Sequence, residues 1–111
     1  MSRPMLTPET HNALRLFGGL IEEGRLRKGW SREELAQRVG VGVLTIRRVI
    51  QGAPGVAIGT YFEAATLVGI PLFALESQGL LDRELARQQE KLQLLPSRVR
   101  RPQEDRVDDD F

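Results

Sequence analysis

Residues 31–52 of the 111-residue chain read SREELAQRVGVGVLTIRRVIQG, and this stretch carries the most specific structural pattern of the sequence. Ser31 and Glu34 stand three residues apart, which is the capping-box spacing that begins a helix. Leu35 and Ala36 then start an apolar face that continues at helical intervals. The first half of the stretch therefore predicts a short helix that packs on one side only.

A second helix follows after a glycine. Gly40 tolerates the left-handed conformation that ends a helix, and Ile46 and Val49 repeat at helical spacing beyond it. Two helices that cross at a tight turn need a small residue where they touch, a glycine in the turn, and a branched apolar residue that locks them together. Ala36, Gly40 and Ile46 occupy these places in that order. We therefore predict two packed helices joined by a turn, the second helix at about residues 42–51.

The second of these helices has an outward face that carries polar and charged side chains. Successive residues of a helix are about 100° apart, so the side chains opposite Ile46 and Val49 point to solvent. In the major groove of DNA, arginine can pair with guanine and glutamine with adenine. We predict that this face contacts DNA; the alternatives are an ordinary solvated face or a protein contact at Leu44. The face comprises Leu44, Arg47, Arg48 and Gln51, with Val43 and Thr45 at its edges.

Charge is unevenly distributed along the chain, although the net charge is only +1. Residues 15–52 carry eight lysines or arginines and four glutamates, a net of +4, whereas residues 103–111 carry five acids and one arginine, a net of −4. The basic part is typical of a protein with a polyanionic partner, and Arg32 together with the amino end of its helix can hold a phosphate. The acidic part indicates a flexible tail that avoids this partner or contacts another protein. Ordinary solvated surface is the alternative for both.

A first helix is predicted from Thr7 and Pro8, a cap followed by a first-turn proline, to about residue 28. Gly18 and Gly19 lie inside this stretch, where each glycine costs about 1 kcal/mol relative to alanine. The helix therefore either begins after these glycines or uses them for close packing.

The remaining residues complete the prediction of an all-α fold. A fourth helix is expected after Thr60, a short fifth helix at residues 71–75 and a sixth at residues 79–95. Residues 96–111 hold too little apolar surface to offset the entropy of ordering. The predicted organisation is a compact five-helix domain at residues 8–78, a C-terminal helix at residues 79–95 for dimer or partner contact, and a disordered charged tail at residues 96–111.

The composition excludes several kinds of site. The chain has no cysteine and one histidine, His11, which excludes disulfides, thiolate or imidazole metal clusters, and serine or cysteine triads. The paired acids Glu22–Glu23 and Glu33–Glu34 diverge on their helices, so we expect neither an enzyme nor a cofactor. No apolar run approaches the ~20 residues of a membrane span, and the amino end lacks an apolar signal core. We expect a cytoplasmic protein.

The sequence resembles the XRE, or Cro/C1-type, helix-turn-helix family over residues 16–73, most clearly in GRLRKGWSREELAQRVGVGVLTIRRVIQG at residues 24–52. The next stretch, GAPGVAIGTYFEAATLVGIPLF, together with LPSRVR and the acidic segment, is similar to HipB-type antitoxins. The resemblance implies a lambda-repressor-like domain that binds double-stranded operator DNA as a homodimer. It also implies a repressor that regulates its own operon and binds a HipA-like kinase toxin. A stand-alone regulator is one alternative, and an adaptor that kept the fold but lost DNA binding is another.

The resemblance also assigns roles to residues by position. It implies that Arg32 contacts phosphate and that the exposed face of the following helix lies at or near the groove. Two departures from the family pattern matter. Gly42 and Val43 replace hydrogen-bonding residues, which weakens base readout at the helix start. Ile50 replaces the glutamate that often pairs with the arginine of the first helix, which implies that Arg25 is free to contact phosphate.

Apolar residues after the fourth helix offer a surface for a second copy of the chain. One helix-turn-helix unit covers one half-site of DNA, so a dimer is expected. These residues offer more apolar surface than a short closing helix should leave exposed to water. The alternative is that they complete the core of the monomer. The predicted dimer or partner contacts are Ile70, Leu72, Phe73, Leu80 and Leu81.

Overall fold

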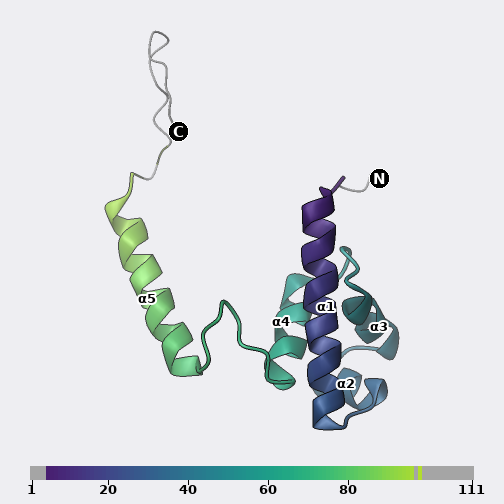
Figure 1. Ribbon diagram of the computed structural model, residues 1–111. Coiled ribbons are helices and arrows are strands. Elements are labelled where there is room, and N and C mark those ends of the chain that lie inside the picture. Colours follow the sequence, from purple (N-terminus) through teal and green to yellow (C-terminus); the bar gives the residue numbers. More distant parts are fainter. Residues whose placement is uncertain (1–4, 97, 99–111) are drawn as a thin grey trace. The chain divides into compact units, whose positions relative to one another are not determined.

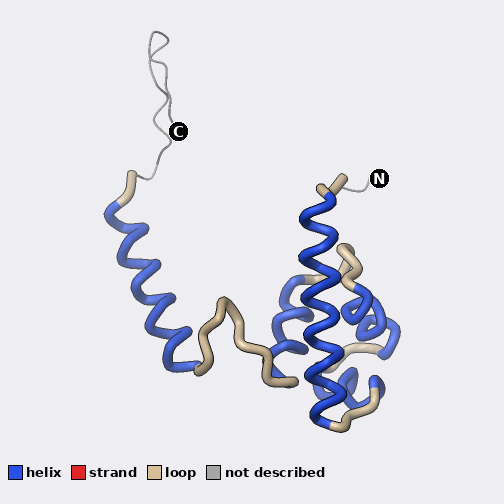
Figure 2. The backbone as a smooth tube through the Cα atoms, viewed as in Figure 1, coloured by secondary structure: helices blue, strands red, loops and turns tan. Residues whose placement is uncertain are grey.

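The computed structural model describes residues 5–96 and 98, and the regular elements in these residues are α-helices (Figures 1 and 2). The chain divides into two units, Met1–Glu76 and Ser77–Phe111. The predicted all-α class is confirmed, and the disorder predicted for residues 96–111 falls almost entirely outside the described residues. The first unit contains α1 (Pro8–Lys28), α2 (Arg32–Val39), α3 (Val43–Gln51) and α4 (Ile58–Leu67), and the second unit contains α5 (Gln78–Leu94).

Side-chain caps begin α1 and α2 where the sequence predicts them. The Thr7 hydroxyl accepts a hydrogen bond from the backbone N–H of Thr10 at 3.2 Å, and Pro8 occupies the first turn. Ser31 Oγ accepts from the Glu34 N–H at 3.0 Å, while Glu34 Oε1 accepts from the Ser31 N–H at 2.7 Å. Each such cap contributes about 0.5–2 kcal/mol to stability. The helix α1 therefore starts before its two glycines.

The core of the first unit draws on all four of its helices. The helix α1 packs on α3 and α4, and α2 packs on the same two helices. Burial of an isoleucine, leucine or valine side chain stabilises the fold by about 1.5–3 kcal/mol. The buried apolar residues are Ile21, Leu35, Ala36, Ile46, Val49, Tyr61, Ala64, Ala65 and Val68.

The helices α1 and α3 approach each other so closely at Gly18 that no side chain fits between them. A Cβ atom at this position would lie 2.6 Å from the carbonyl oxygen of Ile50 and closer still to that of Val49. These oxygens belong to the backbone of α3 and cannot move aside unless the helix moves. Gly19, by contrast, faces open space. Of the two glycines inside α1, Gly18 therefore serves close packing.

The helix predicted at residues 71–75 is instead a tight turn. The Leu75 N–H donates to the Leu72 carbonyl at 3.0 Å, and the two residues form an isolated antiparallel bridge. Phe73 and Ala74, between them, have φ values of 56° and 60°, which are left-handed values that no right-handed helix contains. The turn keeps Leu72 packed against the core, and this packing overrides the helical signal of Pro71.

The fourth helix begins earlier than predicted, at Ile58 rather than after Thr60. The Ala57 carbonyl accepts a hydrogen bond from the Thr60 N–H at 3.0 Å, and this bond closes the first turn. Ala57 has no side-chain acceptor that could cap the helix. The sequence therefore carries no capping signal at the true start, whereas Thr60 resembles a cap.

Separate substitution of the two glycines tests the contact between α1 and α3. We expect Gly18→Ala to lower the free energy of unfolding by about 1–3 kcal/mol, because the new methyl group overpacks against two backbone oxygens. Gly19→Ala is the matched control and should raise the free energy of unfolding by about 0.5–1 kcal/mol, because it replaces a helical glycine that faces open space. Urea unfolding followed by circular dichroism measures both. Equal effects of the two substitutions would contradict the close contact.

Candidate nucleic-acid interface

The helix α3 has one buried face and one exposed face, as predicted. Ile46 and Val49 have no exposed surface, whereas Leu44 on the opposite side is 62% exposed. The predicted exposure is confirmed, and the predicted contacts with DNA stay a prediction. The exposed residues are Leu44, Arg47, Arg48 and Gln51, with the half-buried Val43 and Thr45 at the edges of the face.

Among the described residues, no acid forms a salt bridge with either arginine of α3. Both guanidinium groups therefore remain available to a phosphate or to the edge of a guanine. In the part of the chain that the structure describes, the salt bridges join Arg25 and Arg32 to Glu22, Arg27 to Glu23, and Arg87 to Glu84.

The turn before α3 fixes where that helix starts. Gly40 has a φ of 90°, and its N–H and that of Val41 both donate to the Ala36 carbonyl, at 2.8 and 3.0 Å. A residue with a Cβ atom is strained at this φ, so the turn requires glycine. Gly42 precedes α3 and supplies no side-chain cap. The amino end of α3 is therefore open to an external acceptor such as a phosphate oxygen.

A buried tyrosine holds the chain where α3 ends. Tyr61 Oη donates to the Ala53 carbonyl at 2.6 Å, and the Tyr61 ring stacks on Phe17 with 5.7 Å between the centroids. Burial raises the pKa of Tyr61, so the hydroxyl keeps the proton that it donates. The sequence places Tyr61 at the start of the fourth helix but gives no signal for this hydrogen bond. The helix α3 is thus held at both ends.

The prediction that Arg25 is free to contact phosphate is wrong. Arg25 is only 9% exposed, and its guanidinium group donates to both carboxylate oxygens of Glu22, at 2.8 and 2.7 Å. It also donates to the Trp30 carbonyl at 2.7 Å. Glu22 lies three residues before Arg25 on α1. It pairs with Arg25 in place of the glutamate that the family often has where this chain has Ile50. Arg25 therefore stabilises the corner between α1 and α2.

The same glutamate contacts Arg32, the first residue of α2. Arg32 Nη2 lies 3.4 Å from Glu22 Oε2, and the Arg32 side chain is 43% exposed. Hydrogen bonds from Arg25, and to a lesser extent from Arg32, lower the pKa of Glu22, although its partial burial acts in the opposite direction. One ionised carboxylate thus serves two guanidinium groups and leaves the group of three with a net positive charge. The role of Glu22 was missed in the sequence, where its spacing of three from Arg25 was the available signal.

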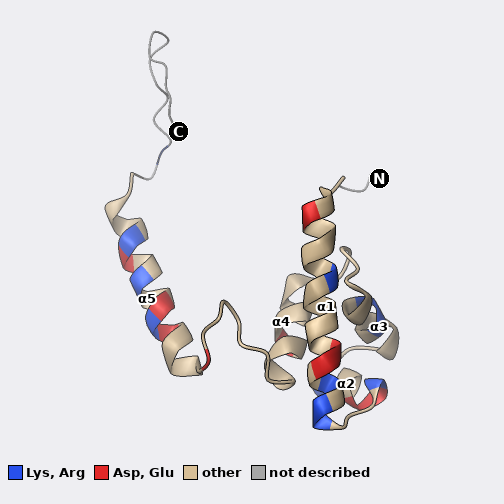
Figure 3. Cartoon of the chain, viewed as in Figure 1, with Lys and Arg blue, Asp and Glu red and all other residues tan. Residues whose placement is uncertain are grey.

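Basic residues gather at the end of α1, on α2 and on α3 (Figure 3). At the corner between α1 and α2, the Arg38 guanidinium carbon lies 4.1 Å from the centroid of the Trp30 ring and Lys28 Nζ lies 5.7 Å from it. Trp30 is half-buried and packs against the core. Each cation–π contact of this kind contributes about 0.5–1 kcal/mol at an exposed site. The indole therefore holds two cations near the amino end of the helix-turn-helix segment.

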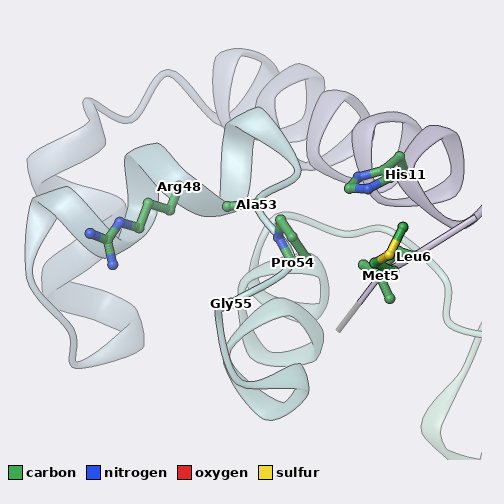
Figure 4. Close-up of a pocket in the computed structure, with 7 residues that line it drawn as sticks. All are labelled: Met5, Leu6, His11, Arg48, Ala53, Pro54 and Gly55. Carbon is green, nitrogen blue, oxygen red and sulfur yellow. The ribbon is translucent and has the colours of Figure 1, made fainter. Parts of the chain in front are cut away.

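A hollow of about 740 Å³ lies beside the end of α3 (Figure 4). Arg48 borders it, but in Figure 4 the Arg48 guanidinium group points away from Met5, Leu6 and His11. Among the described residues the lining contains no acid, and the other residues that line the hollow are Ala53, Pro54 and Gly55. Arg48 therefore faces outward with the rest of the exposed α3 face.

The predicted dimer contacts differ in how exposed they are. Ile70 and Leu72 pack against the core, which agrees with the alternative that they complete the monomer. Phe73 is 74% exposed and touches Phe62 edge-on, with 6.0 Å between the ring centroids. In the second unit, Leu80 is 42% exposed and Leu81 is half-buried. Contact with a second copy stays a prediction for all of them.

The described residues contain neither a candidate metal site nor a candidate membrane span. Within 5–96 and 98, no three histidine, aspartate or glutamate side chains gather as a metal site would require. Every helix there is too short or too polar to traverse a lipid bilayer. The longest, α1, has 21 residues and carries seven charged side chains.

Comparisons with known proteins agree with this geometry. Residues 21–75 match the helix-turn-helix family, and this range contains all of α2, α3 and α4. The crystal structure of the hypothetical transcription factor NHTF from Neisseria is similar to this chain, with a TM-score of 0.51 and 22% sequence identity. That similarity covers 85% of this chain and 98% of the Neisseria chain, and at this identity it shows the fold alone. No curated protein matches the sequence.

The pH dependence of stability tests the role of Glu22. Because its pKa is lowered in the folded state, its stabilisation is fully present above the ordinary value of 4.5 and is lost as the pH falls through the lowered value. We expect Glu22→Gln to lower the free energy of unfolding by about 1–3 kcal/mol at neutral pH. The difference from the wild type should shrink as the pH falls below 4.5. Urea unfolding at a series of pH values measures it, and a difference that is independent of pH would contradict the role.

Proposed function

We propose that this chain, whose residues 21–75 match the helix-turn-helix family, is a sequence-specific transcriptional repressor that binds operator DNA as a homodimer. The family match itself supports a DNA-binding regulator. One observation carries the finer proposal: Arg47 and Arg48 are exposed on α3, while Ile46 and Val49 anchor the opposite face in the core. A fixed helix that presents two available guanidinium groups is suited to the major groove.

In this proposal, some residues of α3 contact the bases and others offer them no hydrogen bond. Arg47 and Arg48 pair with guanine edges or with phosphate, and Leu44 can contact a thymine methyl group. Gly42 and Val43 offer no side-chain hydrogen bond at the start of the helix. Base discrimination therefore depends on the two arginines and on the shape of the DNA.

Arg32 contributes affinity rather than specificity. It lies at the amino end of α2, where Glu22 holds one side of its guanidinium group and 43% of the side chain remains exposed. A phosphate contact there neutralises backbone charge and does not depend on the base sequence. Because one helix-turn-helix unit covers one half-site, a homodimer would span two half-sites about 34 Å apart.

We further propose that the protein is the antitoxin of a HipA-like kinase toxin and represses the operon that encodes both. Two features support this: the similarity of residues 52–73 to HipB-type antitoxins, and the acidic character of residues 103–111. An acidic segment with little apolar surface suits a contact that orders on binding a basic partner surface. A stand-alone regulator is the alternative within the same class.

The exposure of Leu44 favours a second candidate function, that of an adaptor. Leu44 is 62% exposed beside Val43, so this end of α3 could dock on another protein instead of DNA. The two functions differ in their response to salt. Binding to DNA weakens steeply as salt rises because condensed counterions are released, whereas an apolar protein contact does not.

Substitution of single arginines separates base readout from phosphate contact. We expect Arg47→Ala to reduce discrimination at one base pair by about 1–3 kcal/mol, because a bidentate contact is lost. Arg32→Ala should weaken binding to all duplexes alike. Gel shifts on a duplex selected from a random pool, and on its single-base variants, measure both. Arg83→Ala on α5 removes the same charge outside the helix-turn-helix segment and is the control. Uniform weakening by Arg47→Ala would show that Arg47 does not read a base.

Co-purification from the native host tests the antitoxin proposal. We expect the full chain to retain a kinase-fold protein that a neighbouring reading frame encodes, and a chain truncated after residue 96 to retain less of it. Operator binding by the truncated chain is the control for folding. Retention of no kinase by a full chain that still binds its operator would favour the stand-alone regulator.

A further inference from the structure

We propose that α5 is a self-association surface that pairs antiparallel with α5 of a second copy of this chain. No residue of α5 is buried in the structure. Leu85 and Leu92 are 55% and 56% exposed, so the helix leaves large apolar side chains in contact with water. This inference rests on the proposed function, which requires a homodimer. It deepens that function by naming the surface through which the two copies pair.

Three of the five leucines of α5, together with a glutamine, follow a heptad pattern. They recur at alternating steps of four and three residues, which keeps them along one side of the helix and is the spacing of a coiled-coil seam. A glutamine takes an inner place of the seam, where a polar residue selects the register at a cost in stability. The seam comprises Leu81, Leu85, Gln88 and Leu92. Leu95 has the next place in the spacing but lies after the helix, in an extended conformation.

Charges beside the seam favour a second copy in antiparallel orientation. Glu84 and Lys91 directly precede two seam leucines and therefore lie on the same flank of the seam. A two-fold axis between antiparallel helices brings Glu84 of one copy opposite Lys91 of the other, twice in each dimer. In a parallel pair Glu84 would face Gln89, and Lys91 would face Pro96, so no opposite charges would meet.

The remaining charges of α5 are compatible with this pairing. Glu84 Oε1 lies 3.3 Å from Arg87 Nη1 in the same helix, but both side chains are more than half exposed, so this pair is weak. The side away from the seam carries both signs, Arg83 and Glu90. A membrane-surface helix would instead carry mainly basic residues there. The mixed charge therefore favours a solvated outer side and a protein partner on the seam.

Reversal of the flanking charges tests the orientation without DNA. In the antiparallel pair Glu84→Lys and Lys91→Glu should each raise the dissociation constant of the full-chain dimer about tenfold, because two attractions become two repulsions. The double variant should return to within about twofold of the wild type, and a mixture of the two single variants should form heterodimers preferentially. Sedimentation equilibrium measures all of them. Arg83→Glu changes the net charge as Lys91→Glu does, but on the outer side, and should leave association unchanged.

Cysteine cross-linking gives a second measurement that does not depend on charge. The chain has no cysteine, so each introduced thiol is unique. In an antiparallel pair in which position 81 faces position 92, the two copies of position 81 lie roughly 16 Å apart along the helix axis, too far for a disulfide. Leu81→Cys alone should therefore stay uncrosslinked under mild oxidation. A mixture of Leu81→Cys and Leu92→Cys chains should form a disulfide between the two variants.

The outcomes distinguish this inference from the proposed function. A wild-type chain that stays monomeric at its highest soluble concentration overturns the inference, as does efficient self-crosslinking of Leu81→Cys. An effect of Arg83→Glu equal to that of Lys91→Glu overturns it as well. A dimer that behaves as expected but binds no DNA counts against the proposed function alone. If the chain binds DNA specifically although its α5 helices do not pair, the result counts against this inference alone.

Discussion

The backbone contact between α1 and α3 at Gly18 is the constraint on which the interface depends. The carbonyl oxygens of Val49 and Ile50 occupy the space that a Cβ atom of residue 18 would fill. Because backbone meets backbone, rotation of α3 would either break this contact or create a clash. The packing of the core therefore fixes the direction in which α3 presents Arg47 and Arg48. The residues of the exposed face do not determine this direction.

Glu22 connects the stability of this scaffold to its charged surface. Its carboxylate accepts two hydrogen bonds from the buried Arg25, which in turn donates to the Trp30 carbonyl at the corner between α1 and α2. The same carboxylate lies 3.4 Å from the exposed Arg32. One acid thus satisfies a buried guanidinium group, where an unpaired charge would be costly, and orients a second one toward solvent. Structure and surface charge are coupled at this corner.

Local signals in the sequence were sufficient for most of the first unit, because caps, glycine turns and helical periodicity act over a few residues. Gly40 and the exposed face of α3 were predicted for this reason. The turn at Phe73 was not, because its left-handed conformation follows from the packing of Leu72 on a core that is distant in sequence. The prediction for Arg25 is wrong for another reason: the glutamate that often pairs with this arginine in the family is absent, but Glu22, three residues away, pairs with it instead. Which base sequence the protein prefers cannot be predicted from local signals, because that preference also depends on the DNA.

We propose that α3 presents its arginines to base edges in the major groove. Methylation of guanine N7 by dimethyl sulfate measures this contact, because N7 lies in that groove and accepts hydrogen bonds from arginine. On a duplex that the protein has selected, we predict that binding protects guanines in each half-site, spaced by about one helical turn. Bound DNA in which every guanine N7 reacts as it does in free DNA would contradict a contact between α3 and the base edges.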